Sequence, residues 1–265
     1  MIHLREIRLA KYICLLVVIL TFGLDVQGQV CTGNKGINIF KDGDFGSGAS
    51  PLILANPNIA PGYTYTTGLP SDGFYSITNN TGVWNLYPSW LSIRNNSPDP
   101  NGYMMVVNAS FSPGVFYDKT IQDICGNTLY EFSADVINLI KSNTANHSDP
   151  VIDFLINGQV RFSTGLIPKN EQWNTFGFTF IAPENASSVR LTLRNNAPGG
   201  FGNDLALDNI SFRACGPSAF VGIDPEKAIL LCTDDDPFTI KAEIQGSTNP
   251  RIIWQISRDG LVWDK

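Results

Sequence analysis

One acidic residue sits where a strand should be apolar. The segment "NDLALDNISF", residues 203–212, places Leu205 and Leu207 on one face of an extended strand. Asp208 shares the other face with Ile210 and Phe212. If those two apolar residues point into a core, Asp208 points there too, and burying an unpaired carboxylate is costly. Asp208 therefore needs a partner, which is either a bound cation or a set of N–H donors in a β-bulge.

A second group of candidate residues lies between residues 63 and 96, where aromatic side chains alternate with Asn, Ser, Pro and Gly. Sugar rings stack on aromatic faces, while their hydroxyls bond to polar side chains. The candidates with the most polar neighbours are Trp84, Tyr87 and Trp90, with Arg94 and Asn95 as nearby polar contacts. The alternative is that these rings plug the ends of a β-sandwich.

Catalytic chemistry has little support. The only histidines are His3 and His147, so a Ser-His-Asp triad or a histidine-rich zinc site would depend on one loop residue. Glycoside hydrolysis needs two facing carboxyl groups, and pairs such as Asp72 with Asp99 can be named only arbitrarily. We expect a protein that is not an enzyme.

The N-terminal segment has the layout of a secretory signal peptide. Arg5, Arg8 and Lys11 precede an apolar run over residues 12–24, and small Gly28 follows. We therefore assign residues 1–28 to a signal peptide and expect a secreted, extracellular or cell-surface protein. The alternative is an uncleaved anchor, for which the apolar run is short.

Export favours disulfide formation among the remaining cysteines. The candidates are Cys31, Cys125, Cys215 and Cys232, and four cysteines allow three connectivities. Cys31 and Cys215 flank the first and last strands of the predicted domain, which makes them the favoured pair. The chain carries 18 basic and 24 acidic residues and has no basic patch, so nucleic acid is a poor partner.

Short alternating segments separated by Gly, Pro and Asn predict an all-β fold. In "YEFSADV", for example, Tyr130, Phe132, Ala134 and Val136 share one face. Asn157-Gly158 is a type I′ hairpin signal. The predicted strands are 37–40, 73–78, 103–109, 115–121, 129–138, 151–156, 159–164, 173–181, 188–194 and 205–213.

These strands, with no crossover helix, predict a jelly-roll β-sandwich over residues 29–216. Residues 217–265 have a different sequence pattern, in which Cys232 in a predicted strand is followed by Trp254 as a predicted core residue. That spacing is typical of the first part of an immunoglobulin-like β-sandwich, which we expect to be incomplete at the C-terminus. Further immunoglobulin-like domains of a longer chain are the expected continuation.

Several segments together resemble a known family. "NIFKDGDFGSG", "YEFSADVINL" and "LRNNAPGGFGNDLALDNISFRACGP" are similar to the galactose-binding-like jelly roll of carbohydrate-binding modules. They also resemble the N-terminal module of large secreted, adhesin-like proteins of gliding bacteria, which are associated with gliding motility and type IX secretion. The resemblance implies a glycan-binding or adhesion module, with an extracellular polysaccharide or glycoprotein as partner.

The resemblance also implies a structural calcium ion (Ca2+) between the loop after the first strand and the last strand. Asp208 and Asp44 are the implied ligands. Gly46 stands where many relatives carry an acid, so one expected carboxylate is missing. The β-bulge remains the alternative explanation of Asp208.

We therefore expect a secreted, non-catalytic binding or adhesion module. One alternative is a structural spacer that caps a cell-surface repeat protein. Another is an accessory module of a larger secreted polysaccharide-degrading enzyme.

Overall fold

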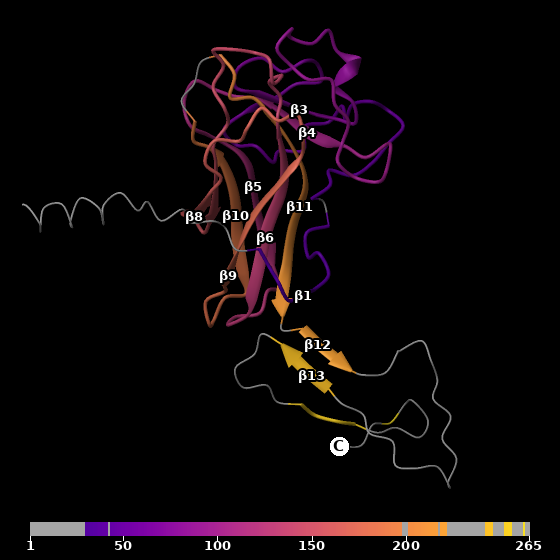
Figure 1. Cartoon of the computed structure of the whole chain (residues 1–265), viewed down its shortest axis with the longest axis vertical. Helices are drawn as coiled ribbons and strands as arrows, with labels where there is room; N and C mark the ends of the chain where they lie inside the picture. The colour runs from indigo at the N-terminus through magenta and orange to yellow at the C-terminus, as the bar shows by residue number, and fades with distance from the viewer. Residues whose placement is uncertain are drawn as a thin grey trace, which may run out of the picture.

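The computed structural model describes residues 30–41, 43–197, 201–216, 218–221, 242–245, 252–255 and 262. The predicted signal peptide and Cys232 lie outside these residues. Two β-sheets pack face to face as a jelly-roll sandwich (Figure 1), which confirms the predicted fold class. Within the described residues, no helix is long and apolar enough to cross a membrane.

The larger sheet has the order β2-β3-β4-β11-β6-β9, and β1 pairs with β11 outside this path. Apart from the parallel β2–β3 pair, its strands are antiparallel. The strands are β1 (Asn34–Lys35), β2 (Thr64–Tyr65), β3 (Phe74–Thr78), β4 (Met104–Asn108), β6 (Leu129–Asn138), β9 (Asn174–Ile181) and β11 (Leu205–Gly216).

The smaller sheet has the order β5-β10-β7-β8 and is antiparallel throughout. Asn157 and Gly158, the turn between β7 and β8, both have positive φ, 50° and 79°, as the predicted type I′ turn requires. The strands are β5 (Gly114–Gln122), β7 (Ile152–Ile156), β8 (Gln159–Ser163) and β10 (Ser188–Asn195).

Alternation places one face of each strand between the sheets. Tyr130, Phe132, Ala134 and Val136 of β6 are all buried in the core between the sheets. This confirms the predicted face of "YEFSADV".

The larger sheet is also covered on its outer face. A second cluster there joins Trp90 and Leu91 to Met104 and Val106 of β4 and to Ala206 of β11. All five residues of β4 are therefore buried, which is why its sequence "MMVVN" lacks a polar face. The segment that contains Trp90 acts as a cover for this sheet.

Nine of the ten predicted strands coincide with observed strands; the differences are the strand expected at 37–40 and the short β2 (Thr64–Tyr65), which was not predicted. Residues 37–40 are not assigned to a strand, and β1 is shorter and earlier. Gly36 and Ile39 still donate backbone hydrogen bonds to Ala214 and Phe212 of β11, at 2.8 and 2.9 Å. The chain follows β11 without forming a continuous ladder, so the strand expected at 37–40 is wrong in its bounds.

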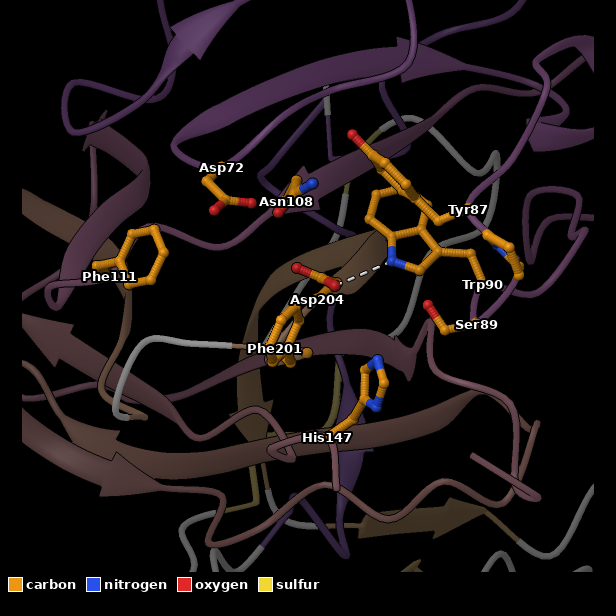
Figure 2. A pocket seen from close by; sticks show the side chains of 11 residues that line it. Asp72, Tyr87, Ser89, Trp90, Asn108, Phe111, His147, Phe201 and Asp204 are labelled. Carbon is orange, nitrogen blue, oxygen red and sulfur yellow. Dashed lines mark hydrogen bonds between the residues drawn. The ribbon is translucent and has the colours of Figure 1, made fainter. Parts of the chain in front are cut away.

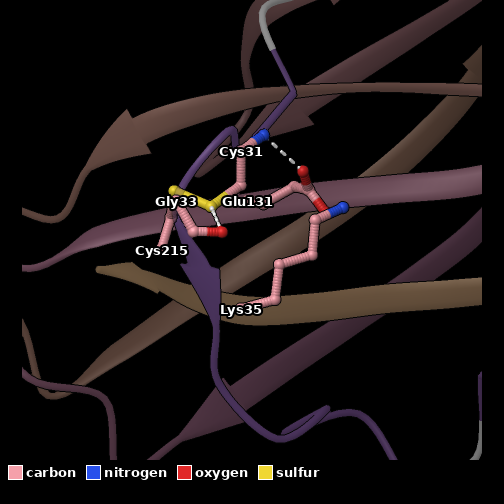
Figure 3. Close-up of a disulfide and its surroundings, with 5 residues drawn as sticks. All are labelled: Cys31, Gly33, Lys35, Glu131 and Cys215. Carbon is pink, nitrogen blue, oxygen red and sulfur yellow. Dashed lines mark hydrogen bonds and ion pairs between the residues drawn. A yellow bond between two sulfur atoms is a disulfide. The ribbon is translucent and has the colours of Figure 1, made fainter. Parts of the chain in front are cut away.

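Cys31 and Cys215 form a disulfide, which confirms the favoured pair (Figure 3). The buried Glu131 lies beside it, accepts the backbone N–H of Cys31 at 2.5 Å and pairs with Lys35 at 2.9 Å. The bond joins the beginning of the domain to the end of β11. Cys125 is a free, exposed thiol.

Beyond β11, β12 (Ser218–Val221) pairs with β13 (Ala242–Gln245) as an antiparallel two-stranded sheet. Trp254, which we expected in a core, is 51% exposed. The immunoglobulin-like domain stays a prediction.

Candidate functional site

A pocket of about 480 Å³ opens at one end of the larger sheet (Figure 2). Strands β3 and β11 begin at this end and β4 and β6 finish there, because Phe74 pairs with Asn108 and Leu205 pairs with both Val107 and Asn138. The volume falls within the range of about 300–1,000 Å³ typical of small-molecule sites. The lining residues are Asp72, Tyr87, Pro88, Ser89, Trp90, Asn108, Phe111, His147, Phe201, Gly202 and Asp204.

Exposed aromatic rings surround this pocket. Phe201 is 82% exposed, Phe111 68% and Tyr87 38%. In Figure 2, Phe111 lies on the side away from Tyr87 and Trp90, with Asp204 between them. Among the described residues from 30 to 216, these three are the only exposed aromatic side chains. Large exposed rings are unfavourable in water, so their convergence on one pocket indicates a binding surface.

Asp204 lies at the base of the pocket and is only 5% exposed. Its Oδ2 accepts the indole N–H of Trp90 at 2.9 Å, and its Oδ1 accepts the backbone N–H of Ala109 at 3.0 Å. Burial raises the pKa of this carboxyl to about 7, against the effect of those two donors, and the negative charge of Asp72 raises it further. Asp204 therefore connects β11 to two other pocket-forming segments.

The covering segment holds Trp90 in place. The backbone N–H of Trp90 donates to the Tyr87 carbonyl at 2.9 Å, which closes a turn. The backbone N–H of Leu91 donates to the Leu139 carbonyl at 2.8 Å. The rings of Tyr87 and Trp90 meet edge to face, with centroids 5.1 Å apart. Trp90 itself is only 2% exposed, so it is the buried partner of this pair, and Tyr87 is the partner that reaches solvent.

Polar groups complete the lining. Asn108 is buried and donates from Nδ2 to the Pro70 carbonyl at 3.0 Å. His147 lies 6.0 Å from the Phe201 ring, measured between centroids, and its Nδ1 is 2.8 Å from the Ala145 carbonyl. A carbonyl only accepts, so Nδ1 carries the proton and Nε2 is the acceptor in the neutral ring.

Two of the five predicted ligand-binding residues, Tyr87 and Trp90, line this pocket. Trp84 is half-buried against the outer cluster. Arg94 is exposed and forms an isolated antiparallel β-bridge with Asn80. The Asn95 side-chain oxygen closes a turn by accepting the backbone N–H of Ser97 at 2.8 Å. Trp84, Arg94 and Asn95 are not among the lining residues, so their role in binding stays a prediction.

Phe111, Phe201, Asp204 and His147 were not predicted. Phe111 in "NASFSPG" and Phe201 in "PGGFGND" have the same polar and glycine-rich neighbours that selected Trp84. That signal could have found both rings. Their convergence with Tyr87 depends on strand order, which the sequence does not reveal.

Asp208 lies at a β-bulge, as one of the two alternatives predicted. The register between β11 and β6 shifts between Asp208 and Ser211, and Asn209 has a φ of 50°. Asp208 is fully buried, and its two oxygens accept the backbone N–H groups of Asn96 and Asn209, both at 2.7 Å. The bulge explains the switch of faces in the sequence.

The loop after β1 approaches this bulge, as the resemblance implied. Gly43 accepts the backbone N–H of Ile210 at 2.8 Å. Asp44 is exposed and accepts the backbone N–H of Gly46 at 3.1 Å. Gly46 has a φ of 77°, a conformation that favours glycine, so backbone geometry accounts for the absence of an acid there.

Burial raises the pKa of Asp208 to about 7, and the charges of Asp135 and Asp44 raise it further. Asp135, paired opposite Asp208, accepts the side-chain amides of Asn96 and Asn209 at 2.8 and 2.9 Å. The described residues contain no group of three or more His, Cys, Asp or Glu side chains suited to hold a metal. Calcium at Asp44 and Asp208 stays a prediction.

No protein-family model matches the chain, and no curated protein matches its sequence. Distantly similar solved structures include the CBM22-1 xylan-binding domain of Paenibacillus barcinonensis Xyn10C, with 12% identity and a TM-score of 0.36 over 59% of this chain and 92% of that domain. TmCBM61 in complex with β-1,4-galactotriose has 10% identity and a TM-score of 0.36, and the match covers 66% of this chain and 97% of that one. The tailspike protein 4 enzymatically active domain of bacteriophage CBA120 has 16% identity and a TM-score of 0.37, over 67% and 21%. These likenesses are distant, so a function has to be argued from the pocket itself.

Proposed function

We propose that this protein is a non-catalytic carbohydrate-binding module whose ligand occupies the pocket around Asp204. The observation that carries the proposal is the convergence of Tyr87, Phe111 and Phe201, the exposed aromatic residues of the described domain, on one pocket. Aromatic faces stack on the C–H faces of sugar rings. Asp72, Asn108 and the Nε2 of His147 supply hydrogen-bonding groups for hydroxyls.

Hydrogen bonding at Asp204 supports binding over catalysis. A general acid must approach the glycosidic oxygen with its own carboxyl group. Both oxygens of Asp204 already accept N–H groups from Trp90 and Ala109, which fixes the carboxyl within the wall of the pocket. Incubation with polysaccharides should therefore release no new reducing ends, whereas steady release would contradict a non-catalytic role.

The test of binding is retention on immobilised polysaccharides and glycan arrays. Phe201→Ala and Phe111→Ala should each weaken retention by roughly two- to tenfold, since one aromatic contact contributes about 0.5–1.5 kcal/mol. Ile181→Ala is a matched control. Ile181 is 66% exposed and pairs with Leu129, at the end of β6 opposite the pocket.

Loss of retention in both Phe variants, with Ile181→Ala unchanged, supports the pocket as the site. Equal retention in all three variants contradicts it. The absence of retention on any glycan favours the alternative of a structural spacer.

Secretion and adhesion at the cell surface belong to the same proposal. The Cys31–Cys215 disulfide supports them, since such bonds persist in oxidising compartments. A role resembling that of adhesin-like modules of gliding bacteria, exported by type IX secretion and followed by immunoglobulin-like domains, extends it. Protease accessibility on intact cells tests the location, because a cytoplasmic protein would be protected.

Calcium binding is a separate proposal for the bulge. The charges of Asp44 and Asp135 raise the pKa of Asp208, so the electrostatic potential at the bulge is negative. A bound divalent cation would offset this repulsion between the carboxylates. Asp208 and Asp44 would hold the ion, and backbone carbonyl or water oxygens, which calcium accepts, would have to complete its shell.

A further inference from the structure

The charge of the pocket narrows the class of sugar it would take, an inference that depends on the proposed function. None of the eleven lining residues is Lys or Arg, and two are Asp. Lys141 and Lys169 contact backbone carbonyls of two lining residues without lining the pocket themselves. Lys141 donates to the Pro88 carbonyl at 2.8 Å, and Lys169 donates to the His147 carbonyl at 2.9 Å and pairs with Asp149.

The charges of Asp72 and Asp204 both influence the groups that line the pocket. The charge of Asp72 raises the pKa of Asp204. The pKa of Tyr87 is raised mainly by burial, and the charges of Asp72 and Asp204 raise it further. Carboxylates that repel each other and oppose ionisation of a nearby phenol create negative potential. A positive charge in the pocket would be stabilised by Asp72 and would favour the ionised form of Asp204.

The aromatic walls favour the same charge. A cation over the face of a Phe or Tyr ring is attracted by the negative face of the π-system. Phe111 and Phe201 are mostly exposed, so their faces are accessible to a ligand. An anionic sugar would meet the carboxyl groups of Asp72 and Asp204, and no Lys or Arg side chain is among the lining residues.

We propose that the pocket preferentially binds sugars with a free, protonated amino group, as in deacetylated hexosamine oligomers, over neutral N-acetylated sugars and uronic acids. The amino group would lie between Asp72 and the aromatic rings. The sugar ring would stack on Phe111 or Phe201.

The test is calorimetric titration, near neutral pH, with glucosamine, N-acetylglucosamine and galacturonic acid oligomers of equal length. The glucosamine oligomer should bind roughly tenfold more tightly than the N-acetylated one, the size of a cation–π contact. The galacturonic acid oligomer should bind weakest. Asp72→Asn should reduce the preference for the amine, and Glu184→Gln, which removes an exposed charge outside the pocket, should not.

Equal binding of the amine and its N-acetylated counterpart, still lost in Phe201→Ala, overturns this inference and leaves the glycan pocket intact. The same holds if uronic acids bind best. If no oligosaccharide binds, both proposals fail. A lysine-rich peptide that binds more tightly than the amino sugar would also overturn the inference, because the pocket would then be a site for cationic peptides.

Discussion

Two buried aspartates four positions apart in the sequence have different surroundings. Asp204 and Asp208 both have a pKa raised to about 7, mainly by burial. Asp204 borders a pocket with exposed aromatic rings. Asp208 is enclosed at a bulge, where Asn96 and Asn209 donate to it.

The comparison teaches that a raised pKa does not by itself mark a functional site. Asp208 stands out in the sequence because it breaks the apolar pattern of its strand, and a bulge with two backbone donors accounts for that. Asp204 attracts less notice because it lies just before β11, outside the alternating part of the strand. Its functional interest comes from the accessible surface beside it.

The largest expected effect is on the pocket side. Trp90→Ala should lower the free energy of unfolding by about 3–5 kcal/mol, since a large buried side chain is removed and Asp204 loses a donor. Trp84→Ala is the matched control, because Trp84 packs on the same cluster but is only half-buried, and its indole N–H has no hydrogen-bond partner among the described residues. Denaturant unfolding measures both, and equal losses would contradict the role given to Trp90.

On the bulge side, Asp208→Ala should lower the free energy of unfolding by about 1–3 kcal/mol for each N–H group left without a partner. Asp208→Asn should cost less, because one acceptor remains. Glycan retention should be unchanged in both variants once they are folded. A loss of retention with normal stability would show that the two regions are not separate.

Both aspartates should make stability depend on pH in the same direction. Their folded pKa of about 7 lies above the ordinary 3.8, so the folded state binds more protons between these values. Stability is therefore fully present below about pH 4 with respect to these groups and falls as pH rises towards 7. Melting temperature should be lower at pH 7 than at pH 5, and less so in Asp208→Asn; the opposite slope would contradict the burial argument.

The smallest expected effect concerns calcium. If the ion binds at Asp44 and Asp208, EDTA should lower the melting temperature by a few degrees, because an ion bound only by the folded state stabilises it. Asp208→Asn should remove this response. An unchanged melting temperature would leave the hydrogen-bonded bulge as the complete explanation of Asp208.

Much of the fold could be predicted because the signals were local. Alternation in "YEFSADV" defined the buried face of β6, and Asn157-Gly158 defined a hairpin. The short N-terminal strand was misplaced because residues 36–39 follow β11 without a complete ladder.

The candidate site was predicted only in part. Tyr87 and Trp90 were selected from their neighbours, but Phe111 and Phe201 reach the same pocket from two other loops. Which loops meet depends on the order β3-β4-β11-β6, and strand order is a property of long-range pairing. The same pairing decides that Asp204 meets the indole of Trp90.

The most direct test of the account is an NMR titration with the glycan that binds best. The Trp90 indole N–H and the Ala109 amide both donate to Asp204, whereas the Asn96 and Asn209 amides both donate to Asp208. We predict that the first two signals shift progressively as ligand is added and that the last two do not. Shifts confined to Asn96 and Asn209, with Trp90 and Ala109 unchanged, would contradict the assignment of the pocket as the binding site.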